Sequence, residues 1–178
     1  MRRLQIGLPK TGPLARAWLM PLGLGQPSIA ITPDGRSLVY VLERQGVTQL
    51  YLRGIDQLEA VPVPHTEHAL GPFFSPDGRW IGFFANNKLK KVAVSGGDTI
   101  ELCDAPNPHG GSWGTDGTIL FATDEGRRPM RVKETGDACE SVPLRVNVGN
   151  FKLPDILPGS KAAIFTNRML GGVGVLSL

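Results

Sequence analysis

Residues 71–103 read GPFFSPDGRWIGFFANNKLKKVAVSGGDTIELC, and this stretch decides the fold class. Turn-forming residues divide it at 76–78 (Pro-Asp-Gly), 86–87 (Asn-Asn) and 96–97 (Gly-Gly). Proline pre-sets the backbone angle of a turn, whereas asparagine and glycine accept left-handed conformations. The segments between the turns are short, are rich in aromatic and β-branched residues, and lack helical periodicity. We therefore predict one antiparallel sheet of four strands, at 72–75, 79–85, 88–94 and 98–103.

The same unit is repeated along the chain. The first turns of successive units begin at Pro33, Pro76, Thr115 and Pro158, at intervals of 43, 39 and 43 residues. Periods near 40 residues with four strands each are typical of the blades of a β-propeller. The predicted fold is all-β, a partial β-propeller of about three and a half four-stranded antiparallel blades.

We place the blades at 28–70, 71–110, 111–153 and 154–178, and expect the last to stop partway through its third strand. Residues 1–27 precede them as an N-terminal strand (4–8) followed by an irregular lead-in. The strands predicted outside the second blade are 29–32, 36–43, 47–52, 58–63, 111–114, 118–123, 130–133, 138–143, 155–157 and 162–166.

The composition is that of a soluble globular protein with many turns. Apolar residues make up 41% and charged residues 20%, and the 23 glycines and 15 prolines are spread over the predicted turns. The net charge is +3, but the basic residues are scattered, so we expect no nucleic-acid partner. The densest basic groups are Arg2-Arg3, Lys88/Lys90/Lys91 and Arg127-Arg128.

Two cysteines, Cys103 and Cys139, match no disulfide framework and no metal-binding spacing. In the repeat alignment Cys139 matches Ile100, so the two cysteines are not equivalent, and we expect free thiols rather than a disulfide. The apolar runs at 4–8 and 14–24 resemble neither a signal-peptide core nor a membrane span. We therefore expect no direct membrane insertion. The compartment stays unknown, with the cytoplasm as the expectation for the chain as written.

The repeated turns at 32–36 (TPDGR), 75–79 (SPDGR), 114–117 (GTDG) and 157–160 (LPGS) resemble those of TolB-like, WD-repeat-like bacterial propellers. Longer phrases narrow this resemblance to the propeller that follows the kinase domain in many bacterial eukaryotic-type serine/threonine protein kinases. There the propeller is taken to be a sensor or interaction module. The phrases are QLYLR (49–53), SPDGRWIGFFANNKLKKV (75–92) and GGSWGTDGTILFA (110–122).

The chain departs from that family in two ways. Family propellers close a ring of roughly six or seven blades, whereas the predicted blades number about three and a half. The chain also has no glycine-rich nucleotide loop, no HRD motif and no DFG motif, so kinase activity does not carry over to it. We expect it to be part of a larger protein. If that protein is a membrane-anchored receptor kinase, the propeller is extracytoplasmic.

One pattern matches a catalytic motif. Residues 110–114 (GGSWG) satisfy G-x-S-x-G, the nucleophile elbow, which needs a strand, a sharp turn and a helix to expose its serine. Here Ser112 aligns with Phe73 on a predicted inner strand, and another strand follows. We predict no catalytic residue, no enzyme activity, no metal site and no cofactor.

Residues 65–68 (His-Thr-Glu-His) offer two imidazoles and a carboxylate, but no further metal ligand is evident, so we expect a solvated loop. Such connections between blades cluster near the mouth of a propeller channel. His68, His109 and Lys152 are therefore the candidate ligand-binding residues of one rim.

Other conspicuous residues have structural explanations. An aspartate recurs at one turn position, which indicates turn chemistry rather than catalysis or calcium binding. The aromatic residues fall on strands, where packing between blades is the expectation. Lysines 88, 90 and 91 form either a solvated strand face or a patch for an acidic partner. The recurring aspartates are Asp34, Asp77 and Asp116, and the aromatic residues are Trp80, Phe83, Phe84, Trp113 and Phe121.

The leading functional hypothesis is a non-enzymatic sensor or protein-interaction module that binds a protein or small ligand at the propeller face. The alternative is the regulatory part of a serine/threonine kinase, or less favourably of a peptidase, whose catalytic domain lies outside this chain. An open arc of blades also exposes an unpaired blade face at each end. We therefore expect self-association through exposed blade edges, with two copies approximating a ring.

Overall fold

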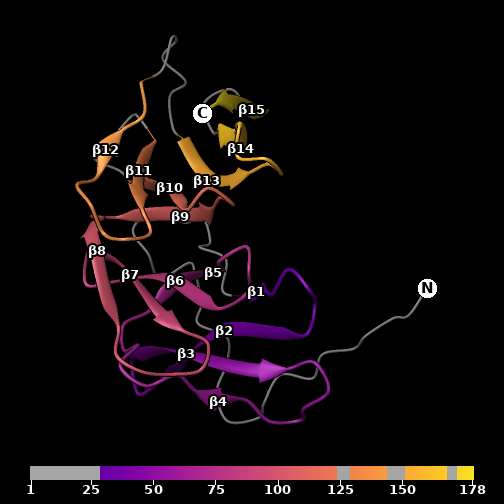
Figure 1. Cartoon of the computed structure of the whole chain (residues 1–178). Helices are drawn as coiled ribbons and strands as arrows, with labels where there is room; N and C mark the ends of the chain where they lie inside the picture. Colours follow the sequence, from indigo (N-terminus) through magenta and orange to yellow (C-terminus); the bar gives the residue numbers. More distant parts are fainter. Residues whose placement is uncertain (1–28, 124–128, 144–150, 168–171) are drawn as a thin grey trace.

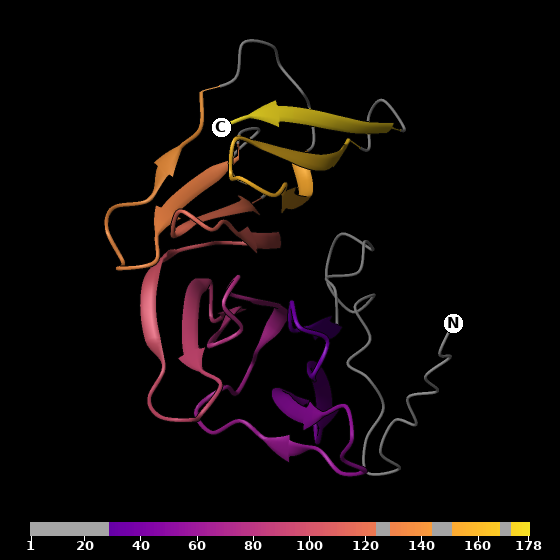
Figure 2. The ribbon, with the colours of Figure 1, turned by 45° about the vertical axis from the view of Figure 1, so that its right-hand side comes forward.

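The computed structural model describes residues 29–123, 129–143, 151–167 and 172–178. These residues form four antiparallel sheets, stacked side by side as the blades of an arc (Figures 1 and 2). The prediction of an all-β partial propeller is confirmed. The predicted strand at residues 4–8, the lead-in up to residue 27 and the Arg127-Arg128 pair lie outside the described residues.

Each of the first three blades contains four strands in simple up-and-down order. Blade 1 consists of β1 (Ile29–Ile31), β2 (Ser37–Arg44), β3 (Val47–Gly54) and β4 (Val61–Pro62). Blade 2 consists of β5 (Leu70–Phe74), β6 (Trp80–Ala85), β7 (Lys88–Ala93) and β8 (Ile100–Asp104). Blade 3 consists of β9 (Pro108–Trp113), β10 (Thr118–Thr123), β11 (Met130–Lys133) and β12 (Glu140–Ser141).

Blade 4 contains three described strands, β13 (Phe151–Ile156), β14 (Ala162–Asn167) and β15 (Gly172–Ser177). β15 pairs with β14 over the whole length of β14. The outer strands β4 and β12 are shorter than predicted. In β4, Pro62 pairs with Tyr51 but has no N–H to donate to the ladder.

The core lies between the blades. Alternating strand residues face one neighbouring blade or the other, because successive side chains of a strand point to opposite faces. Each of the three blade interfaces buries one apolar cluster, and the strand aromatics lie in these clusters as predicted. The largest members are Val41, Leu50, Ile81 and Phe83 between blades 1 and 2, Phe73, Phe84, Trp113 and Phe121 between blades 2 and 3, and Leu120, Phe151 and Phe165 between blades 3 and 4.

The first strands of the blades, β1, β5, β9 and β13, lie side by side along the inner side of the arc (Figure 2). The outer strands β4, β8 and β12 follow its convex side. The arrangement places the ends of the four inner strands, and the turns that follow them, around one concave surface.

Candidate functional site

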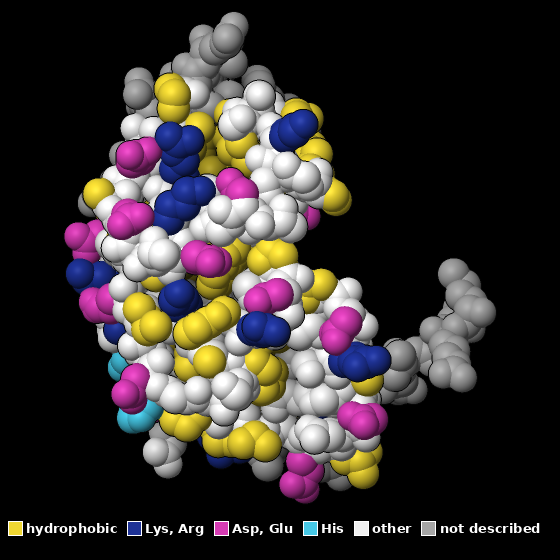
Figure 3. All heavy atoms as spheres, viewed as in Figure 1, with side chains coloured by type: hydrophobic (Ala, Val, Ile, Leu, Met, Phe, Trp, Pro, Cys, Tyr) yellow, Lys and Arg dark blue, Asp and Glu magenta, His cyan; other side chains and the backbone are white. Residues whose placement is uncertain are grey.

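A groove of about 540 Å³ follows the concave surface where the inner strands end. Figure 3 shows the hollow on the right-hand side of the molecule, between its upper and lower sheets, with apolar side chains along its margin. Equivalent residues of the four blades line it in three rows. They are Pro33, Pro76, Thr115 and Pro158 in the turns, Ile31, Phe74, Trp113 and Ile156 at the strand ends, and Ala30, Phe73, Ser112 and Asp155 one residue earlier.

The three rows differ in chemistry from one end of the groove to the other. The row at the strand ends is apolar in all four blades. The row before it is apolar in blades 1 and 2 but polar in blades 3 and 4, where it carries Ser112 and Asp155. Asp155 is the one charged side chain among the described residues that line the groove. The site is therefore an apolar trough with a single carboxylate at one end.

Ser112 ties the two inner strands at the polar end together. Its hydroxyl accepts a hydrogen bond from the backbone N–H of Ile156 (2.9 Å) and donates one to Oδ1 of Asp155 (3.3 Å). The residue lies in β9, and a strand rather than a helix follows, so the context of a nucleophile elbow is lacking. The geometry gives this serine a positioning role between β9 and β13.

The turns at the rim of the groove are held by their aspartates. Asp77 accepts hydrogen bonds from the hydroxyl of Ser75 (2.6 Å) and the N–H of Arg79 (3.0 Å), and these bonds lower its pKa. The same bonds from Thr32 and Arg36 lower the pKa of Asp34. The aspartate therefore closes its own turn.

The third turn uses its aspartate in a slightly different way. Partial burial acts to raise the pKa of Asp116. The hydroxyl and the N–H of Thr118 donate to its carboxylate and outweigh this effect, so the pKa lies below its ordinary value. Lys133, whose ammonium lies 3.7 Å from Oδ2, acts in the same direction. The recurrence of these carboxylates thus follows from turn formation.

The three residues predicted to line a rim lie at the other end of the inner strands. His68 is exposed in the connection before β5, and its backbone N–H donates to the carbonyl of Thr48 (2.7 Å). His109 and Lys152 lie on β9 and β13 and are buried, with 7% and 5% of their surfaces exposed. None of the three lines the groove. Their role as a ligand-binding rim stays a prediction.

A bulge near the start of the inner strands explains how these residues are placed. In β5, β9 and β13 the pairing with the next strand shifts by one residue, around Gly71, Gly110 and Leu153. All three have positive φ, between 48° and 99°, which is the conformation such a bulge needs. In the register of these bulges, His109 and Lys152 are equivalent to each other. His68 precedes the equivalent position in blade 2 by two residues.

The connection that carries residues 65–68 is more than a solvated loop. Thr66 is fully buried within it, and its hydroxyl donates to the carbonyl of Val63 (2.6 Å) and accepts from the N–H of Leu50 (3.2 Å). The hydroxyl satisfies a backbone N–H that the short strand β4 leaves unpaired. His65 and His68 both adopt positive φ, and both are exposed.

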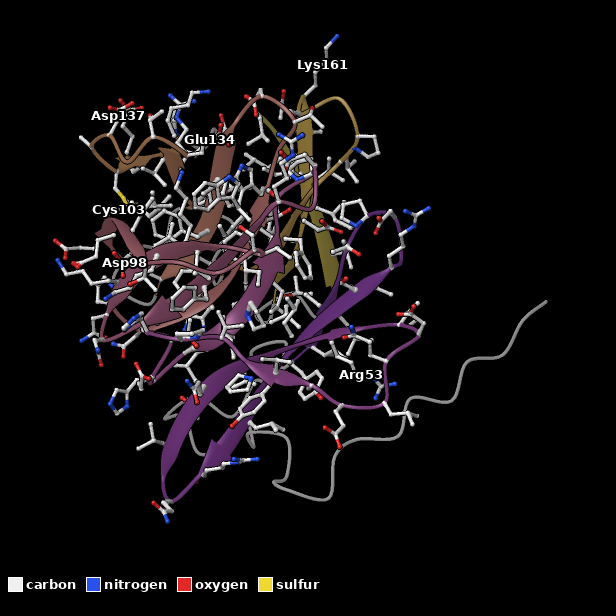
Figure 4. All side chains as sticks on the ribbon, turned by 60° about the horizontal axis from the view of Figure 1, so that its bottom comes forward. Arg53, Asp98, Cys103, Glu134, Asp137 and Lys161 are labelled. Atoms are coloured by element: carbon white, nitrogen blue, oxygen red, sulfur yellow. A yellow bond between two sulfur atoms is a disulfide. The ribbon has the colours of Figure 1, made fainter. Side chains whose placement is uncertain are left out.

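The expectation of free thiols is wrong. Cys103 on β8 and Cys139, just before β12, form a disulfide between blades 2 and 3, with Cα atoms 6.1 Å apart (Figure 4). The alignment of repeats compares equivalent positions, whereas a disulfide needs adjacent ones. The outer strands of neighbouring blades run close together, so non-equivalent positions meet.

The three lysines of β7 do not form a free basic patch. Lys88 contacts Asp104 (2.7 Å) and Glu101 (3.9 Å), and Lys90 contacts Glu101 (3.9 Å). Lys91 donates to the backbone carbonyl of Glu134 in the next blade (2.6 Å) and lies 4.5 Å from the ring centre of Trp80. Lys88 and Lys90 therefore form ion pairs within blade 2, and Lys91 makes a contact between blades 2 and 3.

In the described part of the chain, no group of three or more histidine, cysteine, aspartate and glutamate side chains is placed to hold a metal ion. Nor does that part contain a helix with the length and apolarity that a membrane crossing requires.

No protein-family model matches the chain. An uncharacterized protein of Agrobacterium fabrum is 33% identical over 103 residues, which represent 55% of this chain and 34% of that protein. The chain therefore spans about a third of the length of that relative.

Solved structures share the fold. TolB from Acinetobacter baumannii matches with a TM-score of 0.67 and 13% identity, over 84% of this chain and 40% of its own. A chain of a nidogen/laminin complex matches with a TM-score of 0.66 and 12% identity, over 87% of this chain and 62% of its own. An oligogalacturonate lyase in complex with manganese matches with a TM-score of 0.63 and 15% identity, over 83% of this chain and 48% of its own. At these identities the likeness shows the fold alone. The chain folds as part of a β-propeller.

Proposed function

We propose that this part of a propeller is a non-catalytic binding module, which takes an extended peptide segment of a partner protein into the groove of the inner strands. The observation that carries the proposal is the groove itself. Its walls are largely apolar, Ser112 and Thr115 add hydroxyl groups in blade 3, and Asp155 is the one charged group among the described residues that line it. Pockets that are largely apolar, with a few placed polar groups, are typical binding sites.

The chemistry of the lining describes the partner. Apolar side chains of a peptide would pack against Ile31 and Phe74 at one end, and a lysine or arginine would lie near Asp155 at the other. Asp155 is exposed at this end of the groove, and its negative charge attracts a cationic side chain there. We therefore expect a partner segment with apolar residues followed by a basic residue.

A non-catalytic role is supported by how the serine of the G-x-S-x-G pattern is used. The hydroxyl of Ser112 is engaged with Ile156 and Asp155, and these contacts serve the packing of two blades. The fold itself does not establish a non-catalytic role, because one fold hosts many functions. The oligogalacturonate lyase named above shares the propeller fold. The kinase association that the resemblance implies stays a prediction.

The disulfide bears on where the module works. Disulfides persist in oxidising compartments and are rare where glutathione keeps thiols reduced. We propose an oxidising, extracytoplasmic location in place of the cytoplasmic expectation. Alkylating the thiols of the protein in intact cells, before lysis, tests this. Unreactive Cys103 and Cys139 support the proposal, and two alkylated thiols contradict it.

The binding proposal is tested with a synthetic array of extended octapeptides, in which apolar residues precede a lysine, a norleucine or a glutamate. We expect the lysine series to bind best. The variant Ile31→Glu, at a groove residue that is 56% exposed, should abolish binding without disturbing the core. Val61→Glu, on the outer strand β4, is the matched control.

Asp155→Asn provides the second arm of that test. It should remove the preference for lysine over norleucine while leaving binding of the norleucine series intact. Equal binding of all three series to the wild type, or binding that survives Ile31→Glu, would refute the proposal.

A further inference from the structure

The turn of blade 4 differs from the other three turns at the rim of the groove. In blades 1 to 3 an aspartate accepts hydrogen bonds within its own turn. Blade 4 has Gly159 at the equivalent position, so its turn lacks that support. Its backbone is otherwise the same, because the N–H of Ser160 donates to the carbonyl of Leu157 (3.0 Å), the bond that closes the other turns at a glycine.

Ser160 stands where the other turns have that glycine. Gly35, Gly78 and Gly117 hold the position in blades 1 to 3, with φ between 69° and 75°. Ser160 adopts a φ of 54° there, a left-handed conformation that costs free energy for a residue with a β-carbon. Glycine would form the same turn without that cost. The compensating contact is made by the serine side chain.

The hydroxyl of Ser160 reaches the turn of blade 3. Its oxygen accepts a hydrogen bond from the backbone N–H of Thr115 (2.9 Å) and lies 3.1 Å from the hydroxyl oxygen of Thr115. Gly114 leaves room for this contact, because a β-carbon at residue 114 would lie 2.7 Å from the Ser160 oxygen. The turn of blade 4 is thus held by the neighbouring blade instead of by an aspartate of its own.

This contact lies at the polar end of the groove. Thr115 lines the groove, as do Ser112 and Asp155, which join β9 to β13. Two serine hydroxyls, one on a strand and one in a turn, therefore bridge blades 3 and 4 at this end. The equivalents of Ser112 in blades 1 and 2 are Ala30 and Phe73, whose side chains form no hydrogen bonds.

We propose that Ser160 is a positioning residue of the groove, which fixes the spacing of Thr115 and Asp155 for one cationic side chain of the partner. The inference rests on the peptide-binding function proposed above. A site that is ordered before binding loses less conformational freedom on binding, so a bridged polar end holds a cation more tightly than a loose one. Lys161, the next residue, extends from the turn into solvent (Figure 4) and is not among the residues that line the groove.

The variant Ser160→Gly separates positioning from folding. It removes the hydroxyl and the backbone strain together, so its urea midpoint should equal or exceed that of the wild type. Binding of the lysine octapeptides should weaken about three- to tenfold, the worth of one hydrogen bond, while binding of the norleucine series should not change. Asn87→Gly is the matched control, because Asn87 also has positive φ (60°) but lies in the hairpin between β6 and β7. It should leave the binding of both series unchanged.

Ser160→Ala provides a second variant, which keeps the strain and loses the hydroxyl. It should bind the lysine series as weakly as the glycine variant does, and it should unfold at a lower urea concentration than the wild type. The amide of Thr115 should exchange its hydrogen faster in both variants, which tests the bridge without any peptide. Equal exchange of this amide in all three proteins would show that the bridge is absent and would overturn the proposal.

The outcomes separate this inference from the proposed function. If the wild type prefers lysine over norleucine and Ser160→Gly keeps that preference, Ser160 has only a structural role and this inference alone fails. A wild type without any preference for lysine refutes the proposed function, and the positioning role of Ser160 fails with it.

Discussion

The ring of Phe73 lies directly over the α-carbon of Gly82, its cross-strand partner in blade 2. A β-carbon at residue 82 would overlap the ring, and one at Gly111 of the next blade would lie 2.8 Å from it. One phenylalanine thus fills the space that two glycines leave, one from its own blade and one from the neighbour. Phe165 and Gly174 repeat the arrangement in blade 4.

We predict that Gly82→Ala destabilises the protein by about 1 to 3 kcal/mol, because the added methyl group forces the ring of Phe73 out of its packed position. The free energy of unfolding from urea titration measures this. The double variant Phe73→Leu/Gly82→Ala should recover part of the loss, with a coupling energy of at least about 0.5 kcal/mol. Additive effects of the two changes would show that the ring and the glycine do not interact.

The repeat units, and most strands within them, were predictable from sequence because each turn carries its own chemistry. The strand at 118–123 and the one at 130–133 coincide with β10 and β11, since Thr115-Asp116-Gly117 and the apolar run after it are local signals. The start of an inner strand is less predictable, because the bulge at Gly110 or Leu153 depends on pairing with the next strand. A leucine with positive φ gives no sequence signal of its own.

The groove and the disulfide depend on contacts between blades, which a repeat alignment does not contain. The sequence favours His68 and His109 because of their chemistry in the connections. The groove instead lies at the other end of the inner strands, among apolar residues that the sequence assigns only to packing. Cys103 and Cys139 meet because the outer strands of blades 2 and 3 are neighbours in space. Only a three-dimensional arrangement of blades brings out either feature.

The disulfide should contribute substantially to stability. Cys103 and Cys139 are 36 residues apart, and closing a loop of that length in the unfolded chain is worth about 4 kcal/mol in the chain-entropy description. We predict that the free energy of unfolding of the double variant Cys103→Ser/Cys139→Ser is lower than that of the oxidised wild type by up to that amount. The variant should therefore unfold at a lower urea concentration. The wild type in excess reductant should match the double variant. An unchanged midpoint would mean that the blade interface alone holds this part of the arc.

Acid should destabilise the turns that rim the groove. The pKa values of Asp34, Asp77 and Asp116 lie below the ordinary value of 3.8 in the folded chain. The unfolded state therefore binds protons more readily, and the stabilisation is complete well above pH 4 and is lost as the pH falls through these lowered values. We expect the urea midpoint to drop between about pH 5 and pH 2. In the triple variant with asparagine at the three positions this drop should be smaller, and an equal drop in both proteins would assign the acid sensitivity to other carboxylates.

The hydroxyl of Thr66 accepts a backbone hydrogen bond where a longer strand β4 would be expected to supply the acceptor. Because β4 is only two residues long, the buried N–H of Leu50 has the Thr66 hydroxyl as its acceptor, at 3.2 Å, and that hydroxyl is itself bonded to the Val63 carbonyl. Thr66→Val keeps the shape of the side chain but removes the acceptor, so the N–H is left buried without a partner. We predict a loss of about 1 to 3 kcal/mol in the free energy of unfolding.

Thr66→Ser is the matched control, because it keeps the hydroxyl and removes only a methyl group. Its loss should be clearly smaller than that of the valine variant, and the amide of Leu50 should stay protected from hydrogen exchange in the serine variant alone. If valine is tolerated as well as serine, the connection between blades 1 and 2 is held by apolar packing around Ala69 and Val63, and the hydroxyl is dispensable.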